Sequence, residues 1–181
     1  MDAMCSSMSL SLAPLSLSEA PSSFSEIFRK FILDNLDAPL HGNFEGATTS
    51  ILFPDKLYLS SRLIVEQLHR GKCRIHGITH LVIVHDLPET PVPGVDIFQR
   101  KCTDMSDVMG HMDEIESYLR SVFEDPSSKV VILCNAGQTR SGMATCEFLR
   151  RYTGLDMETI FAFVKKQRSV IDDGISTYLK K

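Results

Sequence analysis

The sequence of 181 residues has no tryptophan, no long hydrophobic run and no excess of positive charge. Its longest apolar segments, such as 81–84 and 130–133, are far shorter than the roughly 20 residues of a membrane-spanning helix, so we expect no membrane span. The formal net charge is −4, and the 19 lysines and arginines do not gather in one segment. This charge pattern argues against a nucleic-acid partner. The chain is typical of one compact soluble domain.

Cysteine is scarce and scattered, with five residues at positions 5, 73, 102, 134 and 146. An odd number at irregular spacing does not form the framework of a disulfide-rich secreted domain, and nothing near the start resembles a secretory leader. We therefore predict a cytoplasmic protein, with the nucleus as a further location. Cys73, His76, His80 and His85 are of metal-binding types, but residues 80 and 85 of one strand would face opposite sides. No metal site and no cofactor are expected.

Residues 1–22 differ in composition from the rest of the chain. They are rich in serine and have too few large apolar side chains for burial to offset the entropy of ordering, which predicts a disordered tail. Ser23 and Glu26 then have the spacing of a helix capping box. No later segment is rich enough in glycine or proline to separate two domains. We expect one domain over residues 23–181.

The rest of the sequence alternates helical patterns with short apolar runs. The runs 78–84 and 130–133 predict strands buried on both faces, and 51–59, broken at Pro54 and Asp55, predicts two short edge strands. A weaker strand is expected over 95–98, and helices over 24–36, 62–69, 105–124, 141–152 and 157–167, with a short helix at the end. This pattern indicates an α/β fold with a central, mostly parallel sheet of four or five strands flanked by helices.

Residues 130–142 carry the chemistry, because an apolar strand ends at Cys134, a short loop follows, and Arg140 begins a helix. Inward-pointing backbone N–H groups, a helix N-terminus and a guanidinium fork all attract anions. The same field lowers the pKa of a thiol, so we expect Cys134 to be a thiolate. The predicted phosphate-binding residues are Asn135, Ala136, Gly137, Gln138, Thr139 and Arg140.

A thiolate beneath a bound phosphate ester is placed to attack phosphorus and form a cysteinyl-phosphate intermediate. Arg140 would stabilise charge on the phosphate oxygens, and Ser141 would hydrogen-bond the departing sulfur. The leaving group also needs a proton from a carboxylic acid on another loop. Asp104 and Asp107 are both candidates, since they precede the long helix at the edge where open α/β sheets bind ligands.

The pattern Cys134-x5-Arg140-Ser141, after an apolar strand and before a helix, resembles the signature of cysteine-dependent protein tyrosine phosphatases, most closely the small atypical dual-specificity phosphatases. Segments 56–61 and 77–82 resemble early strands of that family. The family's general acid corresponds by position to Asp104, 30 residues before the nucleophile, with Asp107 the weaker choice as a helix cap. The resemblance implies hydrolysis of phosphotyrosine, and in addition phosphoserine and phosphothreonine, on phosphorylated protein substrates.

Two features depart from that family. Leu133 stands where the family has a histidine whose hydrogen bonds shape the loop, and residues 168–174 replace a turn that usually contains proline and asparagine. Both favour an alternative interpretation, a pseudophosphatase that binds phosphorylated partners with little turnover. A phosphatase for RNA 5′ ends or glycans is a further alternative, although the net negative charge disfavours RNA.

Overall fold

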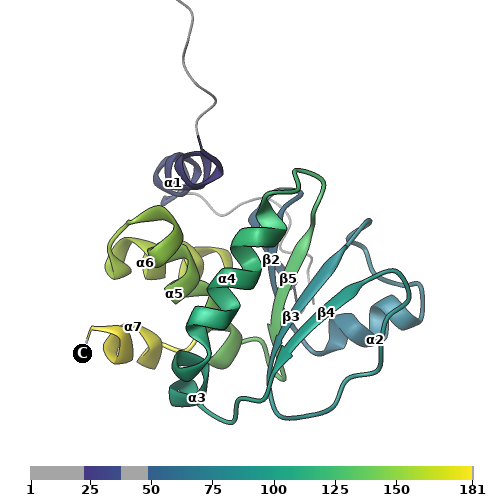
Figure 1. The fold of residues 1–181 in the computed structure, drawn as a ribbon. Coiled ribbons are helices and arrows are strands. Elements are labelled where there is room, and N and C mark those ends of the chain that lie inside the picture. Colours follow the sequence, from purple (N-terminus) through teal and green to yellow (C-terminus); the bar gives the residue numbers. More distant parts are fainter. Residues whose placement is uncertain (1–22, 38–48, 181) are drawn as a thin grey trace, which may run out of the picture.

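The computed structural model describes residues 23–37 and 49–180, which form a five-stranded sheet with helices on both faces (Figure 1). The predicted tail over residues 1–22 lies outside the described residues. The strands are β1 Thr49–Phe53, β2 Leu57–Ser61, β3 His80–Val84, β4 Asp96–Arg100 and β5 Val130–Cys134. Their order is β1-β2-β5-β3-β4, with β1 and β2 antiparallel and the other pairs parallel. The expected α/β fold is confirmed.

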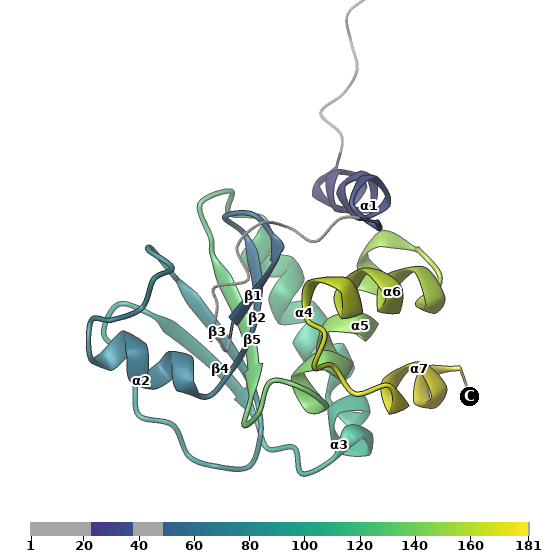
Figure 2. The same cartoon turned by 180° about the vertical axis from the view of Figure 1, so that it is seen from behind.

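Seven helices lie within the described residues, and of these α2 covers one face of the sheet while the others lie on the opposite side (Figure 2). The helices are α1 Phe24–Asp34, α2 Leu63–His69, α3 Met105–Gly110, α4 Met112–Phe123, α5 Arg140–Thr153, α6 Met157–Gln167 and α7 Gly174–Leu179. Helix α5 follows β5 directly and contacts β5, β2 and β3. The sheet and α5 therefore set the position of the loop between them.

The central strand β5 joins two separate hydrophobic cores. Val130, Ile132 and Cys134 pack into the core shared with α1, α4, α5 and α6, whereas Val131 and Leu133 pack into the core beneath α2. Successive side chains of a strand point to opposite faces, so a strand covered on both sides must be apolar throughout. All five residues of β5 are buried. The prediction of a strand buried on both faces is confirmed.

Helix α1 is held against the sheet by aromatic rings. Phe28 stacks on Phe53 of β1 with ring centroids 4.3 Å apart and lies 5.5 Å from the ring of Phe123 in α4. At the start of the helix, the N–H of Ser23 donates to a carboxylate oxygen of Glu26 at 3.0 Å, as the capping-box spacing predicts. The helix thus contributes to the same core that surrounds β5.

The prediction of two edge strands before α2 was wrong for the second of them. Of these two strands, β1 lies at an edge of the described sheet but β2 does not, because β2 pairs with β5 as well as with β1. All five residues of β2 are buried. The turn at Pro54 and Asp55 correctly marks the break, but the second partner of β2 lies some seventy residues later, beyond the reach of a local pattern.

The single long helix expected from Met105 is two helices. Helix α3 ends at Gly110 and α4 begins at Met112, with His111 between them at φ −103° and ψ 2°. Glycine weakens a helix at such a point. Val108, Met112 and Ile115 nevertheless face the same core. The apolar periodicity therefore continues through the break, which is why the sequence pattern did not reveal it.

The ends of the helices that follow β5 agree with expectation. Helix α5 terminates at Gly154, whose φ of 68° is the left-handed conformation that favours glycine at a helix C-terminus. Helix α6 has the bounds predicted for it. The last helix, α7, has six residues and is short, as expected.

Replacing Phe28 by alanine should lower the free energy of unfolding by about 3–5 kcal/mol, because truncating a buried phenylalanine leaves a cavity. Denaturant unfolding would measure the loss. The neighbouring Ile27, whose side chain points outward with 41% exposure, provides the control. Ile27→Ala should cost less than about 1 kcal/mol. Equal losses for the two variants would contradict the packing of α1 against the sheet.

Candidate active site

The candidate nucleophile Cys134 is the last residue of β5. It lies at the edge where the parallel strands β2, β3 and β5 end, which is the edge at which open α/β sheets bind ligands. Residues 135–139 connect it to α5, whose first residue is Arg140. The strand end, the loop, the helix N-terminus and Arg140 therefore meet at one place, as the sequence predicted.

Several hydrogen-bond donors face the sulfur of Cys134. The hydroxyl of Ser141 and the backbone N–H of Gly137 each lie 3.2 Å from Sγ. Burial opposes ionisation of this thiol, but the hydrogen bonds from Ser141, Gln138 and Gly137 outweigh it and lower the pKa of Cys134 below its ordinary value. The sulfur is thus set up to carry negative charge.

Gly137 gives the loop its shape. Its φ is +68°, and a Cβ at this position would lie 2.5 Å from the carbonyl oxygen of Ser60 in β2 and 2.7 Å from the guanidinium of Arg168. Side chains other than hydrogen are excluded on both grounds. The glycine lets the loop pack closely on β2 while its N–H points at the sulfur of Cys134.

Arg168 supports the loop from beneath, a role that the sequence did not reveal. Its buried guanidinium donates from Nε to the carbonyl oxygen of Gly137 at 2.5 Å, and Nη2 lies 3.5 Å from that of Ala136. Burial lowers the pKa of Arg168 more than the charge of Cys134 raises it, so the net direction is downward. Lys165 and Lys166 precede it at the end of α6. No sequence signal distinguishes the one basic residue of this group that turns inward.

The side chain of Arg140 connects the phosphate loop with two neighbouring loops. Its Nη1 donates to the carbonyl oxygen of Cys102 at 2.6 Å and lies 3.4 Å from a carboxylate oxygen of Asp86. Cys102 belongs to the segment that leads to Asp104 and α3. Asp86 was not among the predicted site residues. Its position just after a buried parallel strand could have indicated that it lies at the ligand-binding edge of the sheet.

The helix-capping role expected of Asp107 belongs to Asp104. Asp104 is the residue that caps α3, because its Oδ1 accepts the N–H of Asp107 at 2.9 Å. Asp107 instead accepts hydrogen bonds from the hydroxyl and the N–H of Thr103, at 2.6 and 2.8 Å, which lower the pKa of its carboxyl. The expectation that Asp107 caps the helix was therefore wrong, whereas the correspondence of Asp104 by position to the family's acid stays a prediction. A carboxyl held ionised is a poor proton donor, however, so Asp107 remains the weaker candidate.

Three further features bear on the expected chemistry. The side chain of Leu133 is fully buried in the core beneath α2, and because it is apolar it offers no hydrogen bond to the loop. Within residues 23–37 and 49–180, no group of three His, Cys, Asp or Glu side chains is arranged to hold a metal ion. Across the same ranges, no helix is both long and apolar enough to pass through a bilayer.

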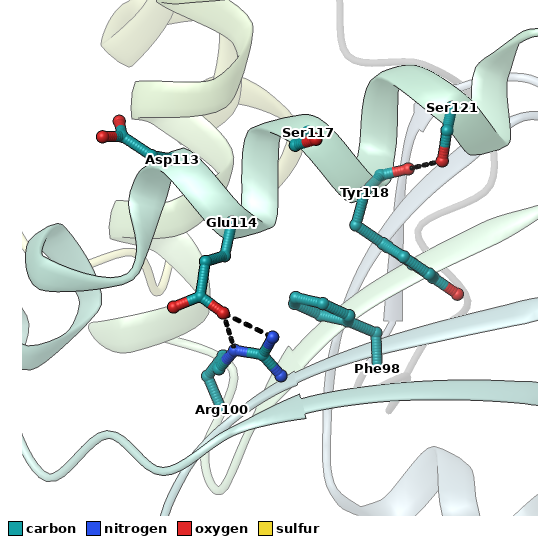
Figure 3. A pocket seen from close by; sticks show the side chains of 7 residues that line it. All are labelled: Phe98, Arg100, Asp113, Glu114, Ser117, Tyr118 and Ser121. Atoms are coloured by element: carbon teal, nitrogen blue, oxygen red, sulfur yellow. Dashed lines mark hydrogen bonds and ion pairs between the residues drawn. The ribbon is translucent and has the colours of Figure 1, made fainter.

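A surface pocket of about 530 Å³ lies between β4 and α4, apart from the loop of residues 135–139 (Figure 3). Phe98 and Tyr118 line it, and their rings stack with centroids 4.4 Å apart. Arg100 pairs with Glu114 across it, and Asp113 pairs with Arg151. The other lining residues are Ser117 and Ser121. The pocket contributes no group to the surroundings of Cys134.

Solved structures that superpose on this chain include phosphatases and a phosphatase-like protein. Human DUSP28 superposes with a TM-score of 0.60 at 22% identity, covering 79% of this chain and 94% of that chain. The human tyrosine phosphatase-like serine/threonine/tyrosine-interacting protein superposes with a TM-score of 0.60 at 17% identity, covering 73% of this chain and 93% of that chain. At such identities the likeness concerns the fold.

Sequence comparisons add the family. A candidate tyrosine phosphatase of Invertebrate iridescent virus 6, the protein 123R, is 29% identical over 69 residues, which are 38% of this chain and 48% of the viral protein. The match thus spans about half the length of that relative. The family model described as dual specificity phosphatase, catalytic domain, matches residues 66–178, more than half of the chain. This match contains the strand end, the loop and the arginine described above, and the chain belongs to the dual-specificity phosphatase catalytic-domain family.

Proposed function

We propose that the protein hydrolyses phosphate monoesters on tyrosine side chains of proteins, and on serine and threonine, through a cysteinyl-phosphate intermediate. The observation that carries this proposal is the sulfur of Cys134, which receives hydrogen bonds from Ser141 and Gly137 and has a lowered pKa. A thiolate at neutral pH is the form of cysteine that attacks phosphorus. Membership of the family supports the class of reaction.

In the first step, the N–H groups of residues 135–139 and the guanidinium of Arg140 bind the phosphate oxygens. The thiolate of Cys134 attacks phosphorus, and the bond from phosphorus to the ester oxygen breaks. Asp104, in its protonated form, gives its proton to that oxygen as it leaves. Charge on the phosphate is stabilised by donors that are already in place, so the mechanism uses no metal ion.

In the second step, a water molecule attacks the phosphorus of the intermediate. Asp104, now ionised, accepts a proton from this water, and the bond from phosphorus to sulfur breaks. The hydroxyl of Ser141 donates to the sulfur of Cys134 and stabilises it as a thiolate while it departs. The enzyme returns to its starting state with inorganic phosphate as product.

Acidic side chains beside the loop favour substrates with a single phosphate. Thr139 donates to the carboxylate of Asp172 at 3.1 Å, and Asp86 lies 3.4 Å from Arg140. Residues 135–139 contain no lysine that would offset these charges. An inositol polyphosphate would bring several negative charges close to both carboxylates, at a cost in electrostatic energy. A phosphorylated protein side chain brings one phosphate only.

A second candidate function is a module that binds phosphorylated proteins with little turnover. Leu133 has no polar side-chain atom with which to bind the loop. This feature would slow catalysis without removing the anion site. One relative of the same fold is named as a phosphatase-like interacting protein, so the fold is compatible with either function.

Hydrolysis of phosphotyrosine by wild type, Cys134→Ser and Asp104→Ala separates these candidates. We expect Cys134→Ser to lose turnover, and Asp104→Ala to lower kcat/KM by about 10²-fold or more, since general acid catalysis contributes about 10²–10⁴. Asp107→Ala is the matched control and should lose less than Asp104→Ala. Wild-type rates no better than those of Cys134→Ser would favour the binding module. Wild-type rates in Asp104→Ala would reject the assignment of the acid.

The reactivity of Cys134 should depend on Ser141. In Ser141→Ala the thiolate loses the hydrogen bond from the hydroxyl, so the pKa of Cys134 rises and iodoacetamide alkylation becomes fast only at higher pH. The rate of alkylation as a function of pH measures this shift. Thr145→Val, one turn further along α5, removes a buried hydroxyl that has no hydrogen-bond partner among the described residues, and should leave the curve unchanged. Coincident curves for Ser141→Ala and wild type would refute the role of Ser141.

Gly137→Ala should weaken anion binding. Its Cβ would meet the carbonyl oxygen of Ser60 at 2.5 Å, so the loop has to move away from β2. We expect the affinity for vanadate to fall by at least about tenfold, as measured by inhibition of hydrolysis. Gly71→Ala is the control, because Gly71 has a similar φ of +61° but no atom within 4 Å of the added Cβ. Loss of vanadate binding in both variants would point to general destabilisation.

A further inference from the structure

A buried cluster of charged and polar side chains lies beside the phosphate loop and has no part in the steps above. His85, which directly follows β3, is fully buried, and the side chain of Glu89 is 3% exposed. Nε2 of His85 lies 2.9 Å from Oε1 of Glu89, and the same oxygen accepts a hydrogen bond from Nε of Arg62. A carboxylate is costly to bury unless it is paired, so these contacts hold Glu89 in place.

The ring of His85 is neutral in this cluster. Its Nδ1 accepts the N–H of Leu87 at 3.1 Å, which leaves the ring proton on Nε2, facing Glu89. Burial lowers the pKa of His85. The charge of Glu89 raises that pKa, and the charges of Arg62 and Arg140 lower it further, so the net direction is downward. The ring therefore stays neutral at neutral pH.

The cluster reaches the phosphate loop at two points. The backbone N–H of Arg62 donates to the carbonyl oxygen of Asn135, the first residue of the loop, at 3.2 Å. Asp86, the residue after His85, lies 3.4 Å from Nη1 of Arg140, the arginine at the end of the loop. One contact thus fixes where the loop begins, and the other restrains the side chain that binds phosphate.

The segment that carries Asp86 is also fixed from β4. Nε2 of Gln99 donates to the carbonyl oxygens of both His85 and Leu87, at 3.3 and 2.7 Å. With Nδ1 of His85 bound to the N–H of Leu87, residues 85–87 have little freedom to move. The backbone that carries Asp86 is therefore held by groups outside the phosphate loop.

The neighbouring position 133 makes external support of this kind necessary. Leu133 points into the core beneath α2 and has no polar atom in its side chain with which to bind the loop. The loop instead relies on donors from other elements. Arg168 donates to the carbonyl oxygen of Gly137, and the backbone N–H of Arg62 donates to the carbonyl oxygen of Asn135. Glu89 secures the second of these supports, because it is the acceptor for the side chain of Arg62.

We propose that the cluster of His85, Glu89 and Arg62 is a positioning element of the active site, which presets the loop and Arg140 for a phosphate-sized dianion. Glu89 is its central residue, since one carboxylate oxygen serves both partners. It acts through Arg62 and the segment that holds Asp86, without touching the substrate. The kinetic part of this inference rests on the proposed phosphatase function, whereas its effect on anion binding does not depend on turnover.

The test uses Glu89→Gln, which removes the charge and keeps the size of the side chain. We expect the Kd for tungstate, a non-covalent mimic of phosphate, to rise about tenfold, because small displacements of binding groups cost up to about 10²-fold in function. The KM for phosphotyrosine should rise with it, more than kcat falls. The pKa of Cys134 from alkylation should stay unchanged, because Glu89 gives no hydrogen bond to the sulfur.

Two further variants serve as controls. Glu66→Gln makes the same change in an exposed ion pair of α2, where Glu66 lies 3.7 Å from Arg70, and should leave the Kd for tungstate unchanged. Arg62→Lys keeps the positive charge and the backbone N–H but loses the planar fork, so an intermediate rise in Kd is expected. All measurements are made well below the melting temperature of each variant, which unfolding curves establish.

The outcomes separate the two proposals. If Glu89→Gln lowers the melting temperature but binds tungstate and phosphotyrosine as wild type does, the cluster is structural only and the positioning role is overturned. If wild type has no turnover, the proposed function is overturned. Weaker tungstate binding by Glu89→Gln would in that case still support the positioning role, and binding equal to that of wild type would overturn it as well.

Discussion

The site depends on keeping a negative charge on a sulfur atom that is largely removed from water. Burial alone would make Cys134 a neutral thiol, as it does for Cys146, whose pKa it raises to about 12. The difference lies in the hydrogen bonds that Ser141 and the loop N–H groups direct at the sulfur of Cys134. The rest of the fold holds these donors in position.

Holding them requires support from several elements, because a loop that turns its N–H groups inward turns carbonyl oxygens outward. Those oxygens need donors of their own when they are buried. Arg168 at the end of α6 supplies Gly137, and the N–H of Arg62 after β2 supplies Asn135. Residues distant in sequence therefore bind the outer side of the loop while the phosphate would occupy the inner side.

The sequence predicted most of the framework because local patterns carry that information. The buried strand β5, the helix after it and the glycine that ends this helix follow from apolar runs and turn residues. The departures have two kinds of cause. The interior place of β2 depends on its pairing with β5, far along the chain. The break at His111 and the capping role of Asp104 are local, and they depend on backbone angles and on a hydrogen bond across three residues that an apolar pattern does not encode.

The order of strand, cysteine, loop, arginine and helix was determined by the sequence alone, since these residues are neighbours along the chain and their geometry is local. Only the tertiary structure decided which distant side chains complete the site. Among the basic residues near the C-terminus, Arg168 turns inward, and Asp86 rather than another carboxylate meets Arg140. The burial that makes such partners necessary exists only once sheet and helices have packed together, and no single segment contains it.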